Sequence, residues 1–509
     1  MNEKLENYRY FSTSIIFLIL SNVISILIRM GSRIIIARFS SVDLYGLYSV
    51  IWNEMTFVST IALLGLGQQL TITLPREGIE DKKKSIISAL SFSAIIGLIT
   101  LITSILLYVF QINTTYKYSI LISTFFILFL FVQFMFIGLK DFLGYFIQTV
   151  IQSTTMFIMI IILRKILTID ILVYITFGSI GFSIIISIIY LLTKTKSSIK
   201  SFSFSEIKIF KFSKKQMSLF LVDIVNSIIL YLLLKLPQLI VGNYLAGYIN
   251  VAFSIIAFLM ILPQILAAIV GPKISEDYFT SRFTSLNNSF KTSLSLLYFL
   301  QGILIIIFSY LGNFFLKILY GIEYLSGSRI IFFGFILVAI IDSLNYPYAI
   351  YIRNTDHEGL FAIGKIISLT IFVLPALLLL FFLENYLSLA IPIAYLISVT
   401  SLLTFYFFYT IKLNIELENK DIKKLLFWLA IILISAILAF ISNNYILSEI
   451  YLFLICLGNI ILFIVILILL KIINVKLLFR DAKEIISILK ARRKKNNTNS
   501  EIQSENSSI

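Results

Sequence analysis

Four basic residues lie in segments of the sequence that are otherwise apolar. They are Arg29 and Arg33 in "SILIRMGSRIIIARF", Lys235 in "YLLLKLPQLIVG" and Lys365 in "FAIGKIISL". A cation at the centre of a bilayer costs about 2.5–3.5 kcal/mol on insertion scales, so several of them require a wet cavity, counter-charges or a ligand. Arg29 and Arg33 are four residues apart and therefore share one face of a helix. We predict that these four cations bind an anionic group such as a phosphate or pyrophosphate.

Other interpretations of the intramembrane charges are also consistent with the sequence. Arg38, at the end of the first apolar segment, would snorkel to the outer interface or pair with Asp43. Lys365 would equally snorkel or pair with an acidic neighbour. Three acidic residues lie within apolar segments: Glu54, Asp223 and Asp342. Each is a candidate counter-ion or a site for a coupling proton or Na⁺, and the counter-ion is the simpler interpretation.

The composition places these residues in a membrane protein. Of the 509 residues, 59% are hydrophobic and only 13% are charged, which is far too apolar for a soluble globule. Windows long enough to cross about 30 Å of hydrocarbon follow one another from near Phe11 to near Lys471. Each of the roughly 14 windows is a near-continuous apolar run rather than the alternating pattern of a barrel strand. The predicted fold class is all-α, a polytopic membrane protein with about 14 transmembrane helices.

The basic residues in the connections predict the orientation of the chain. An even number of spans puts both termini on one side of the membrane. If that side is cytoplasmic, most of the 41 basic residues fall in cytoplasmic segments. The opposite loops hold only Lys117, Arg164, Lys165, Lys317 and Arg329. This asymmetry follows the positive-inside rule, so we predict a multi-pass protein of the cell membrane with both termini in the cytoplasm.

The longest internal break, "KTKSSIKSFSFSEIKIFKFSKK", divides the first twelve predicted spans into two sets of six. The segments "ARFSSVDLYGLYSV" and "VGNYLAGYINVAF" echo one another across this break, with Gly46 matching Gly247. Two six-helix pseudo-repeats are typical of a transporter whose substrate site lies between them. Prolines that mark kinks or interruptions in the predicted helices are Pro237, Pro263, Pro347, Pro375 and Pro392.

The predicted organisation has five parts. They are an N-terminal six-helix bundle (residues 1–193), a cytoplasmic linker (194–215), a C-terminal six-helix bundle (216–411), added helices 13 and 14 (412–473) and a basic cytoplasmic tail (474–509). The tail contains "RDAKEIISILKARRKK", which predicts either a basic amphipathic helix on anionic lipid or a simple anchor of positive charge.

Several functions are excluded by what the sequence lacks. With a single cysteine, Cys456, and a single histidine, His357, there is neither a disulfide framework nor a cysteine or histidine metal centre. The chain contains no GxxxxGK[ST] motif and no segment outside the spans that is large enough for a glycosyltransferase site. Orientation in the membrane explains the formal charge of +15 without a nucleic-acid partner. We therefore expect no enzyme activity, cofactor or metal.

The first two spans resemble the start of Wzx-type polysaccharide flippases. In "RIIIARFSSVDLYGLYSVIWNEMTFVSTIALLGLGQQLTITLPRE", a basic residue ends the first helix. An acid-aromatic-Gly-Leu-aromatic-Ser turn, a Gly-Leu-Gly and a Pro-Arg-Glu exit then follow. The segment "LPQLIVGNYLAGYINVAFSIIAFLMILPQILAAIVGPKISEDY" is similar to the seventh-to-eighth helix segment of that family. One departure is Gln238, where many relatives carry an acid.

The resemblance implies a member of the multidrug/oligosaccharidyl-lipid/polysaccharide exporter superfamily that works by alternating access. Its substrate would be an oligosaccharide linked to polyprenyl pyrophosphate, moved across the cytoplasmic membrane for surface-polysaccharide assembly. Arg29, Arg33, Lys235 and Lys365 would hold the pyrophosphate or acidic sugars while the polyprenyl tail stays in lipid. The implied partners are this substrate, membrane lipids, and a polysaccharide polymerase or glycosyltransferase.

Two alternative functions are a multidrug cation antiporter of the same superfamily and a membrane oligosaccharide polymerase or ligase. The antiporters usually lack the last two helices and have an acidic lumen, whereas the apolar segments here carry a basic excess. A polymerase or ligase is expected to have a large outer loop with paired charged residues, which the sequence does not contain.

Overall fold

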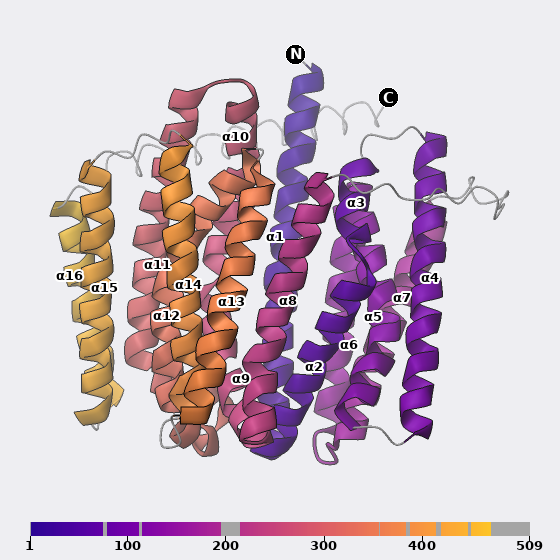
Figure 1. Cartoon of the computed structure of the whole chain (residues 1–509), viewed down its shortest axis with the longest axis horizontal. Helices are drawn as coiled ribbons and strands as arrows, with labels where there is room; N and C mark the ends of the chain where they lie inside the picture. The colour runs from indigo at the N-terminus through magenta and orange to yellow at the C-terminus, as the bar shows by residue number, and fades with distance from the viewer. Residues whose placement is uncertain are drawn as a thin grey trace, which may run out of the picture.

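Sixteen α-helices make up the part of the chain that the structure describes. This structure is a computed structural model, which describes residues 2–74, 79–110, 114–194, 214–355, 357–382, 387–413, 419–445 and 449–469. The helices are α1 (Asn2–Phe39), α2 (Val42–Ala62), α3 (Leu66–Thr73), α4 (Ile79–Val109), α5 (Thr114–Gly138), α6 (Phe142–Leu163), α7 (Ile169–Lys194), α8 (Lys214–Ile240), α9 (Asn243–Leu259), α10 (Ile261–Phe279), α11 (Phe283–Tyr320), α12 (Ile322–Asn354), α13 (Glu358–Phe382), α14 (Leu387–Lys412), α15 (Asn419–Tyr445) and α16 (Glu449–Leu469). They run side by side in one bundle (Figure 1), which confirms the all-α fold class.

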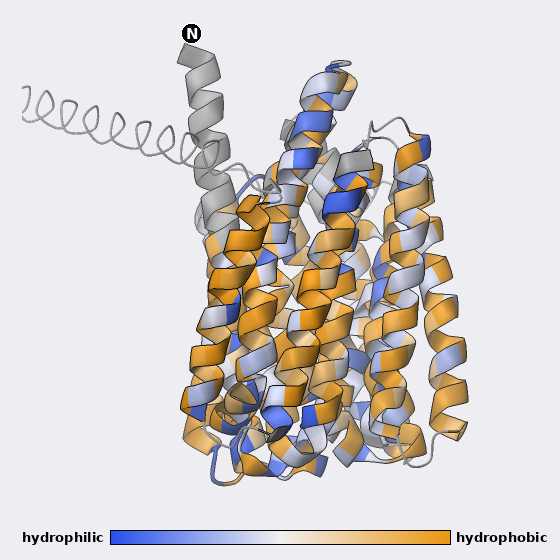
Figure 2. Cartoon of the chain, turned by 90° about the vertical axis from the view of Figure 1, so that its left-hand side faces the viewer, coloured by the Kyte–Doolittle hydropathy of each residue, from blue (hydrophilic) through white to orange (hydrophobic). Residues whose placement is uncertain are grey.

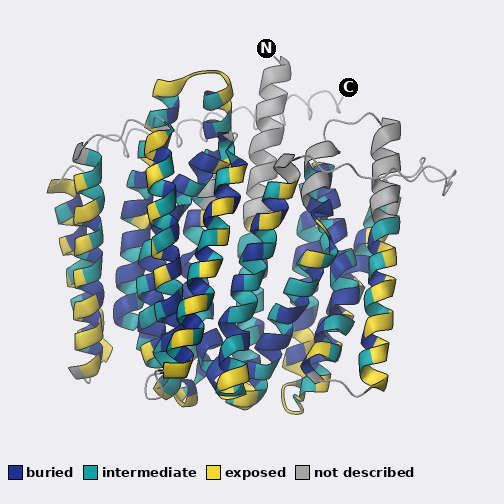
Figure 3. Ribbon diagram, viewed as in Figure 1, coloured by how far each residue is buried: buried dark blue, intermediate teal, exposed yellow. Residues whose placement is uncertain are grey.

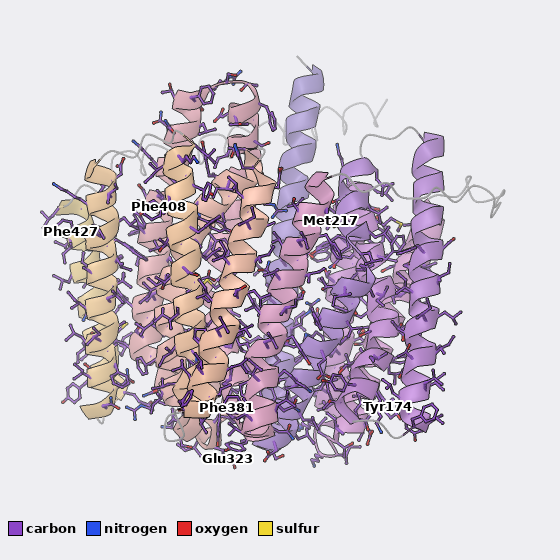
Figure 4. All side chains as sticks on the ribbon, in the orientation of Figure 1. Tyr174, Met217, Glu323, Phe381, Phe408 and Phe427 are labelled. Atoms are coloured by element: carbon purple, nitrogen blue, oxygen red, sulfur yellow. The ribbon has the colours of Figure 1, made fainter. Side chains whose placement is uncertain are left out.

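The surface around the bundle is apolar, as contact with lipid requires. Twelve of the described helices are long and apolar enough to cross a membrane. Hydrophobic residues cover the middle of the helices in Figure 2, and exposed residues follow their outward faces in Figure 3. Large apolar side chains such as Phe381 (66% exposed) and Phe408 (65% exposed) lie on this surface in Figure 4. The chain is therefore a multi-pass membrane protein, while the number of about 14 spans stays a prediction.

Two of the predicted spans are each broken into a pair of helices. The span centred near residue 60 consists of α2 and α3, joined at Leu63, Leu64 and Gly65. Leu64 (φ 47°) and Gly65 (φ 76°) adopt left-handed backbone conformations, which end α2 because an α-helix cannot continue through them. A side chain at Gly65 would also approach Phe220 of α8, with 3.0 Å between the two Cβ atoms.

The span centred near residue 258 is interrupted in the same way, between α9 and α10. Pro263 lies in the first turn of α10 and has no N–H to donate to the carbonyl group of Leu259, so the helix is interrupted at Met260. The prediction of an interruption at Pro263 is confirmed. By contrast, α8, α12, α13 and α14 continue through Pro237, Pro347, Pro375 and Pro392. The two broken spans occupy the second and eighth places in the predicted order, which are equivalent places in the two halves.

The bundle can be described as two sets of helices, with α1–α7 as the first half and α8–α14 as the second. In Figure 1, α3–α7 lie at one side, α1, α2 and α8 near the centre, and α15 and α16 at the opposite edge. The strongest contacts between the halves join α2 to α9 and α8, and α15 and α16 pack against α11. The predicted domain boundaries stay predictions, because most of the linker and all of the tail lie outside the described residues.

Two glycines allow α2 and α9 to cross at close range near the junction of α1 and α2. We call this the outer end of the bundle, following the predicted orientation. A Cβ atom on Gly46 would lie 1.9 Å from the carbonyl oxygen of Asn243, and one on Gly247 would lie 2.6 Å from that of Val42. These reciprocal approaches relate α2 to α9 by an approximate two-fold arrangement. The matched glycines of the sequence echo therefore face one another.

Replacing Gly46 by alanine is expected to lower the free energy of unfolding by about 1–3 kcal/mol, because the methyl group forces the two backbones apart. Thermal unfolding of the purified protein in detergent measures this effect. The matched control is Gly178→Ala in α7, where an added Cβ meets nothing within 4 Å. The control should match the wild type or exceed it slightly, because alanine favours the helix more than glycine does. Equal melting of the two variants would contradict the close crossing.

Candidate functional site

A pocket between the two halves contains two of the predicted cations. Arg29 and Arg33 of α1 line it from the first half, and Asn250 of α9 lines it from the second. The remaining lining residues are Tyr45, Tyr48, Ser49, Trp52, Asn53 and Met156. None of these described lining residues is acidic, so they do not compensate the charges of the two guanidinium groups. We call this the arginine pocket.

The two arginines differ in the partners of their donor groups. Arg33 donates from Nη1 to the Ser254 hydroxyl oxygen of α9 at 3.2 Å, so its side chain reaches across to the second half. The Nε atom of Arg29 is buried and has no hydrogen-bond partner among the described residues. A buried donor without an acceptor is costly. Arg29, which lines the pocket, therefore has donor capacity that the described residues do not use.

One face of α2 supplies most of the uncharged lining. The residues on it are Tyr45, Tyr48, Ser49, Trp52 and Asn53, and their spacing of three and four places them on the same side of the helix. Asn250 fixes this face from the other half, because its Nδ2 donates to the Tyr45 hydroxyl at 2.8 Å and to the Ser49 hydroxyl at 2.6 Å. None of these residues was among the site residues predicted from the sequence, although "YGLYSVIWN" carries the polar and aromatic periodicity that would reveal them.

Aromatic side chains close the arginine pocket at the outer end. The ring of Tyr45 meets that of Tyr324 edge-on, with 5.9 Å between the ring centroids, and lies 6.5 Å from that of Tyr320. All three tyrosines are at most 2% exposed. Because Tyr320 and Tyr324 belong to the second half, this cluster joins the two halves between the pocket and the outer surface.

Arg38 strengthens the same outer closure. Its Nε donates to the carbonyl oxygen of Leu319 at 2.8 Å, and its Nη2 donates to that of Ile318. These carbonyls lie in the last turn of α11, where they lack partners within the helix and where the helix dipole favours a cation. Arg38 thus binds a helix end of the other half, rather than Asp43 as one interpretation of the sequence suggested.

Lys235 of α8 lies outside the arginine pocket, in a buried ion pair with Glu54 of α2. Its Nζ is 2.7 Å from Glu54 Oε1, and the two side chains are 3% and 2% exposed. The Ser119 hydroxyl of α5 donates to the other oxygen of Glu54 at 2.5 Å. The Lys235 ammonium also lies over the Tyr116 ring, 4.7 Å from its centroid. In this conformation Glu54 is the counter-ion of Lys235, and the pair joins the two halves.

Lys365 and Asp342 line a second cavity, of about 390 Å³, which is formed by helices of the second half. We call it the C-half cavity. Its other polar and aromatic lining residues are Asn226, Phe253, Gln264, Tyr346, Ser368 and Tyr395. Asp342 accepts a hydrogen bond from Asn345 Nδ2 at 3.2 Å. The charges of Lys365 and Asp342 attract one another across this space, so the lysine has an acidic neighbour, as one interpretation of the sequence expected.

The structure thus distributes the seven predicted site residues over several environments. Arg29 and Arg33 share the arginine pocket, Lys235 and Glu54 form an ion pair, and Lys365 and Asp342 share the C-half cavity. The seventh residue, Asp223 of α8, lines neither cavity. Among the described residues, no three His, Cys, Asp or Glu side chains are grouped closely enough to hold a metal ion.

Comparison with known proteins identifies the family. The family model described as "Polysaccharide biosynthesis protein" matches residues 11–277, which is more than half of the chain. The chain belongs to the polysaccharide biosynthesis protein family. This match includes the arginine pocket and the ion pair of Glu54 with Lys235. It confirms the resemblance to Wzx-type flippases that the first two spans suggested. No curated protein matches the chain.

Solved structures with a similar fold are transporters of the MOP superfamily. The lipid II flippase MurJ in an inward closed conformation has 17% sequence identity to this family member and a TM-score of 0.60, and the match covers 89% of this chain and 98% of that one. An inward-facing multidrug resistance MATE family transporter has 11% identity and a TM-score of 0.61, and the match covers 76% of this chain and 94% of the transporter. A MOP superfamily transporter from Pyrococcus furiosus has 12% identity and a TM-score of 0.56, and the match covers 79% of this chain and 95% of that transporter. These likenesses show that the chain has the same fold as these transporters.

Proposed function

We propose that this protein is a flippase that moves a polyprenyl pyrophosphate-linked oligosaccharide across the cell membrane by alternating access. The observation that carries the proposal is the arginine pocket, which lies between the two halves and has two guanidinium groups and no acid among its described lining residues. Planar guanidinium groups bind phosphate oxygens through paired, charge-assisted hydrogen bonds. Arg29 and Arg33 would therefore bind the pyrophosphate once the two halves move apart, because the pocket of about 20 Å³ in this conformation has room for no more than a water molecule. The polyprenyl tail would remain in the surrounding lipid.

The contacts between the halves lie on both sides of the arginine pocket, which fits a closed conformation of a transporter. The tyrosine cluster, the crossing at Gly46 and Gly247, and the bonds from Arg38 lie on the outer side. On the inner side, the Ser227 hydroxyl of α8 bonds to the Thr60 hydroxyl of α2 at 3.1 Å. Separation of the inner contacts would admit the substrate from the side that holds both termini, which the loop charges predict to be cytoplasmic. Opening of these outer contacts would release the substrate to the opposite leaflet, where a polymerase or glycosyltransferase would use it.

The family match supports a role in polysaccharide biosynthesis. The similar solved structures include both a lipid II flippase and a multidrug transporter, so the fold alone is compatible with either substrate class. The charge of the pocket favours the lipid-linked anion over a cationic drug. An organic cation would be repelled, because the described lining contains two arginines and no carboxylate. The flippase is therefore the function that the geometry favours.

Reconstitution in liposomes tests this function. Liposomes would contain the purified protein and a fluorescent lipid-linked oligosaccharide in both leaflets, and an external quencher would report transfer of the inner-leaflet lipid. We expect transfer to be at least about tenfold faster than in protein-free liposomes, since a protein path replaces passage of the charged pyrophosphate through hydrocarbon. A fluorescent organic cation is the matched control substrate. Transport of the cation without transfer of the lipid would instead identify a multidrug antiporter.

A further inference from the structure

The C-half cavity differs from the arginine pocket in its electrostatics. Among the described lining residues, the arginine pocket has two cations and no acid, whereas the C-half cavity contains one cation, Lys365, and one acid, Asp342. The two charges of the C-half cavity cancel, so the net charge of this lining is zero. A dianionic pyrophosphate is therefore attracted to the first cavity, and an uncharged polar group is favoured in the second.

The two cavities are neighbours on either side of a shared wall. Asn53 lines the arginine pocket and donates from Nδ2 to the carbonyl oxygen of Leu230 at 2.9 Å, and Leu230 lines the C-half cavity. Helix α9 contributes to both, with Asn250 in the arginine pocket and Phe253 in the C-half cavity. One ligand with two chemically different parts would therefore have two adjacent subsites available, one between the halves and one within the second half.

The C-half cavity combines the groups that recognise a sugar ring. Its ammonium, carboxylate and amide groups can donate to and accept from hydroxyls, and Phe253, Tyr346 and Tyr395 provide ring surfaces for the C–H groups of a pyranose. Packing holds one of these rings in place, because Tyr395 meets Phe335 and Phe372 edge-on at centroid distances of 6.5 and 5.9 Å. The volume of about 390 Å³ lies within the range of small-molecule sites.

Lys365 has polar capacity that the described residues do not use. No hydrogen bond or direct ion pair joins its ammonium group to another described side chain, although Asp342 faces the same cavity. Asp342 in turn has only one of its carboxylate oxygens engaged by Asn345. An ammonium group on a membrane-spanning helix needs several acceptors. Hydroxyl and ring oxygens of an uncharged sugar would supply them.

We propose that the C-half cavity is a subsite for an uncharged sugar of the substrate, an ordinary or N-acetylated hexose, while the arginine pocket holds the pyrophosphate. This proposal rests on the flippase function and adds the location and chemical class of the glycan. Lys365 and Asp342 act in it as a matched donor and acceptor for sugar hydroxyls. Because the net charge of this lining is zero, it gives a hexuronic acid no electrostatic advantage over an uncharged hexose.

Binding to the purified full-length protein tests the subsite. The probes are bare polyprenyl pyrophosphate and the same lipid carrying one hexose, one N-acetylhexosamine or one hexuronic acid, each measured by microscale thermophoresis in detergent. We expect at least one neutral sugar to lower the Kd about tenfold relative to the bare lipid, the gain from roughly one hydrogen bond to a charged group. The uronate should not bind more tightly than the neutral sugars.

Variants separate this subsite from the pyrophosphate site. Lys365→Met and Asp342→Asn, alone and combined, should weaken binding of the neutral glycolipid about tenfold and leave the Kd of the bare lipid unchanged. Thr404→Ala, in the apolar surface groove between α13 and α14, is the matched control and should change neither affinity. The combined variant removes both charges and leaves the cavity neutral, so it still tests the subsite if either single change impairs folding.

The outcomes distinguish failure of the subsite from failure of the function. Wild-type protein that binds none of the four lipids would contradict the flippase itself. Wild-type protein that binds the bare and glycosylated lipids equally, or the uronate most tightly, would overturn the sugar subsite and leave the flippase intact. An equal loss of affinity for bare and glycosylated lipids in the variants would also overturn it.

Discussion

Replacing Arg33 by alanine is expected to slow transfer of the lipid-linked oligosaccharide about ten- to hundredfold in protein that inserts and melts normally. A hydrogen bond to a charged group is worth about 1.5–3 kcal/mol, and each 1.4 kcal/mol is a factor of about ten. Arg29→Ala should have an effect of similar size. The Nε atom of Arg29 has no hydrogen-bond partner among the described residues, so this side chain also has a donor left for the substrate. The initial rate of transfer in liposomes, measured over a range of substrate concentrations, checks both variants.

Two further substitutions make the prediction specific to the guanidinium groups in the pocket. Arg33→Lys keeps the charge but loses the planar pair of donors, so it should retain only part of the activity. Arg164→Ala removes an exposed arginine that stacks over the Phe39 ring, 5.3 Å from its centroid, and lies outside the pocket. This control should transfer lipid at the wild-type rate. Wild-type rates for Arg29→Ala and Arg33→Ala would disprove a cationic substrate site in the arginine pocket.

Removing one member of the buried ion pair is expected to destabilise the protein by about 3–5 kcal/mol. Lys235→Met leaves Glu54 buried without its cation, and Glu54→Gln leaves Lys235 without its anion. The combined variant should recover most of the loss, because neither charge is then left unpaired and the glutamine that replaces Glu54 keeps an acceptor for Ser119. Thermal and denaturant unfolding in detergent measure all three variants.

An exposed ion pair provides the matched control for this effect. Lys317 Nζ lies 2.9 Å from Glu449 Oε1, with the two side chains 50% and 49% exposed. Lys317→Met should therefore cost less than about 1 kcal/mol. If Lys317→Met and Lys235→Met lowered the free energy of unfolding by the same amount, burial would not be the reason for the effect of Lys235→Met.

Lipid binding by the same variants separates two roles for Lys235. If its function is to join α8 to α2, Lys235→Met and Glu54→Gln should both alter the rate of transfer, and neither should selectively weaken pyrophosphate binding. If Lys235 instead binds the substrate after Glu54 releases it in another conformation, Lys235→Met should weaken binding and Glu54→Gln should strengthen it. The sequence-based assignment of Lys235 to the substrate depends on this second result.

Local patterns in the sequence were sufficient to predict the class of the fold. Runs of apolar residues of helical length require helices in a bilayer, because no water is present to satisfy the backbone. The same local information placed an interruption at Pro263, whose missing N–H acts within one turn. The break after α2 was not predicted, because a left-handed conformation at Leu64 depends on its surroundings as well as on the residue type.

In the candidate site, what the sequence determines and what the tertiary structure determines are more clearly separated than in the fold. The sequence alone determined which residues are costly in a membrane, since the desolvation of Arg29, Arg33, Lys235 and Lys365 depends on their chemistry and on their apolar neighbours. It could not determine the partner of each charge. The tertiary structure alone decided that Lys235 pairs with Glu54, that Lys365 shares a cavity with Asp342, and that the two arginines have no acid among the described residues of their pocket. These differences arise where helices far apart in the chain pack together, and helical periodicity specifies the face of a residue but not the helix that it meets.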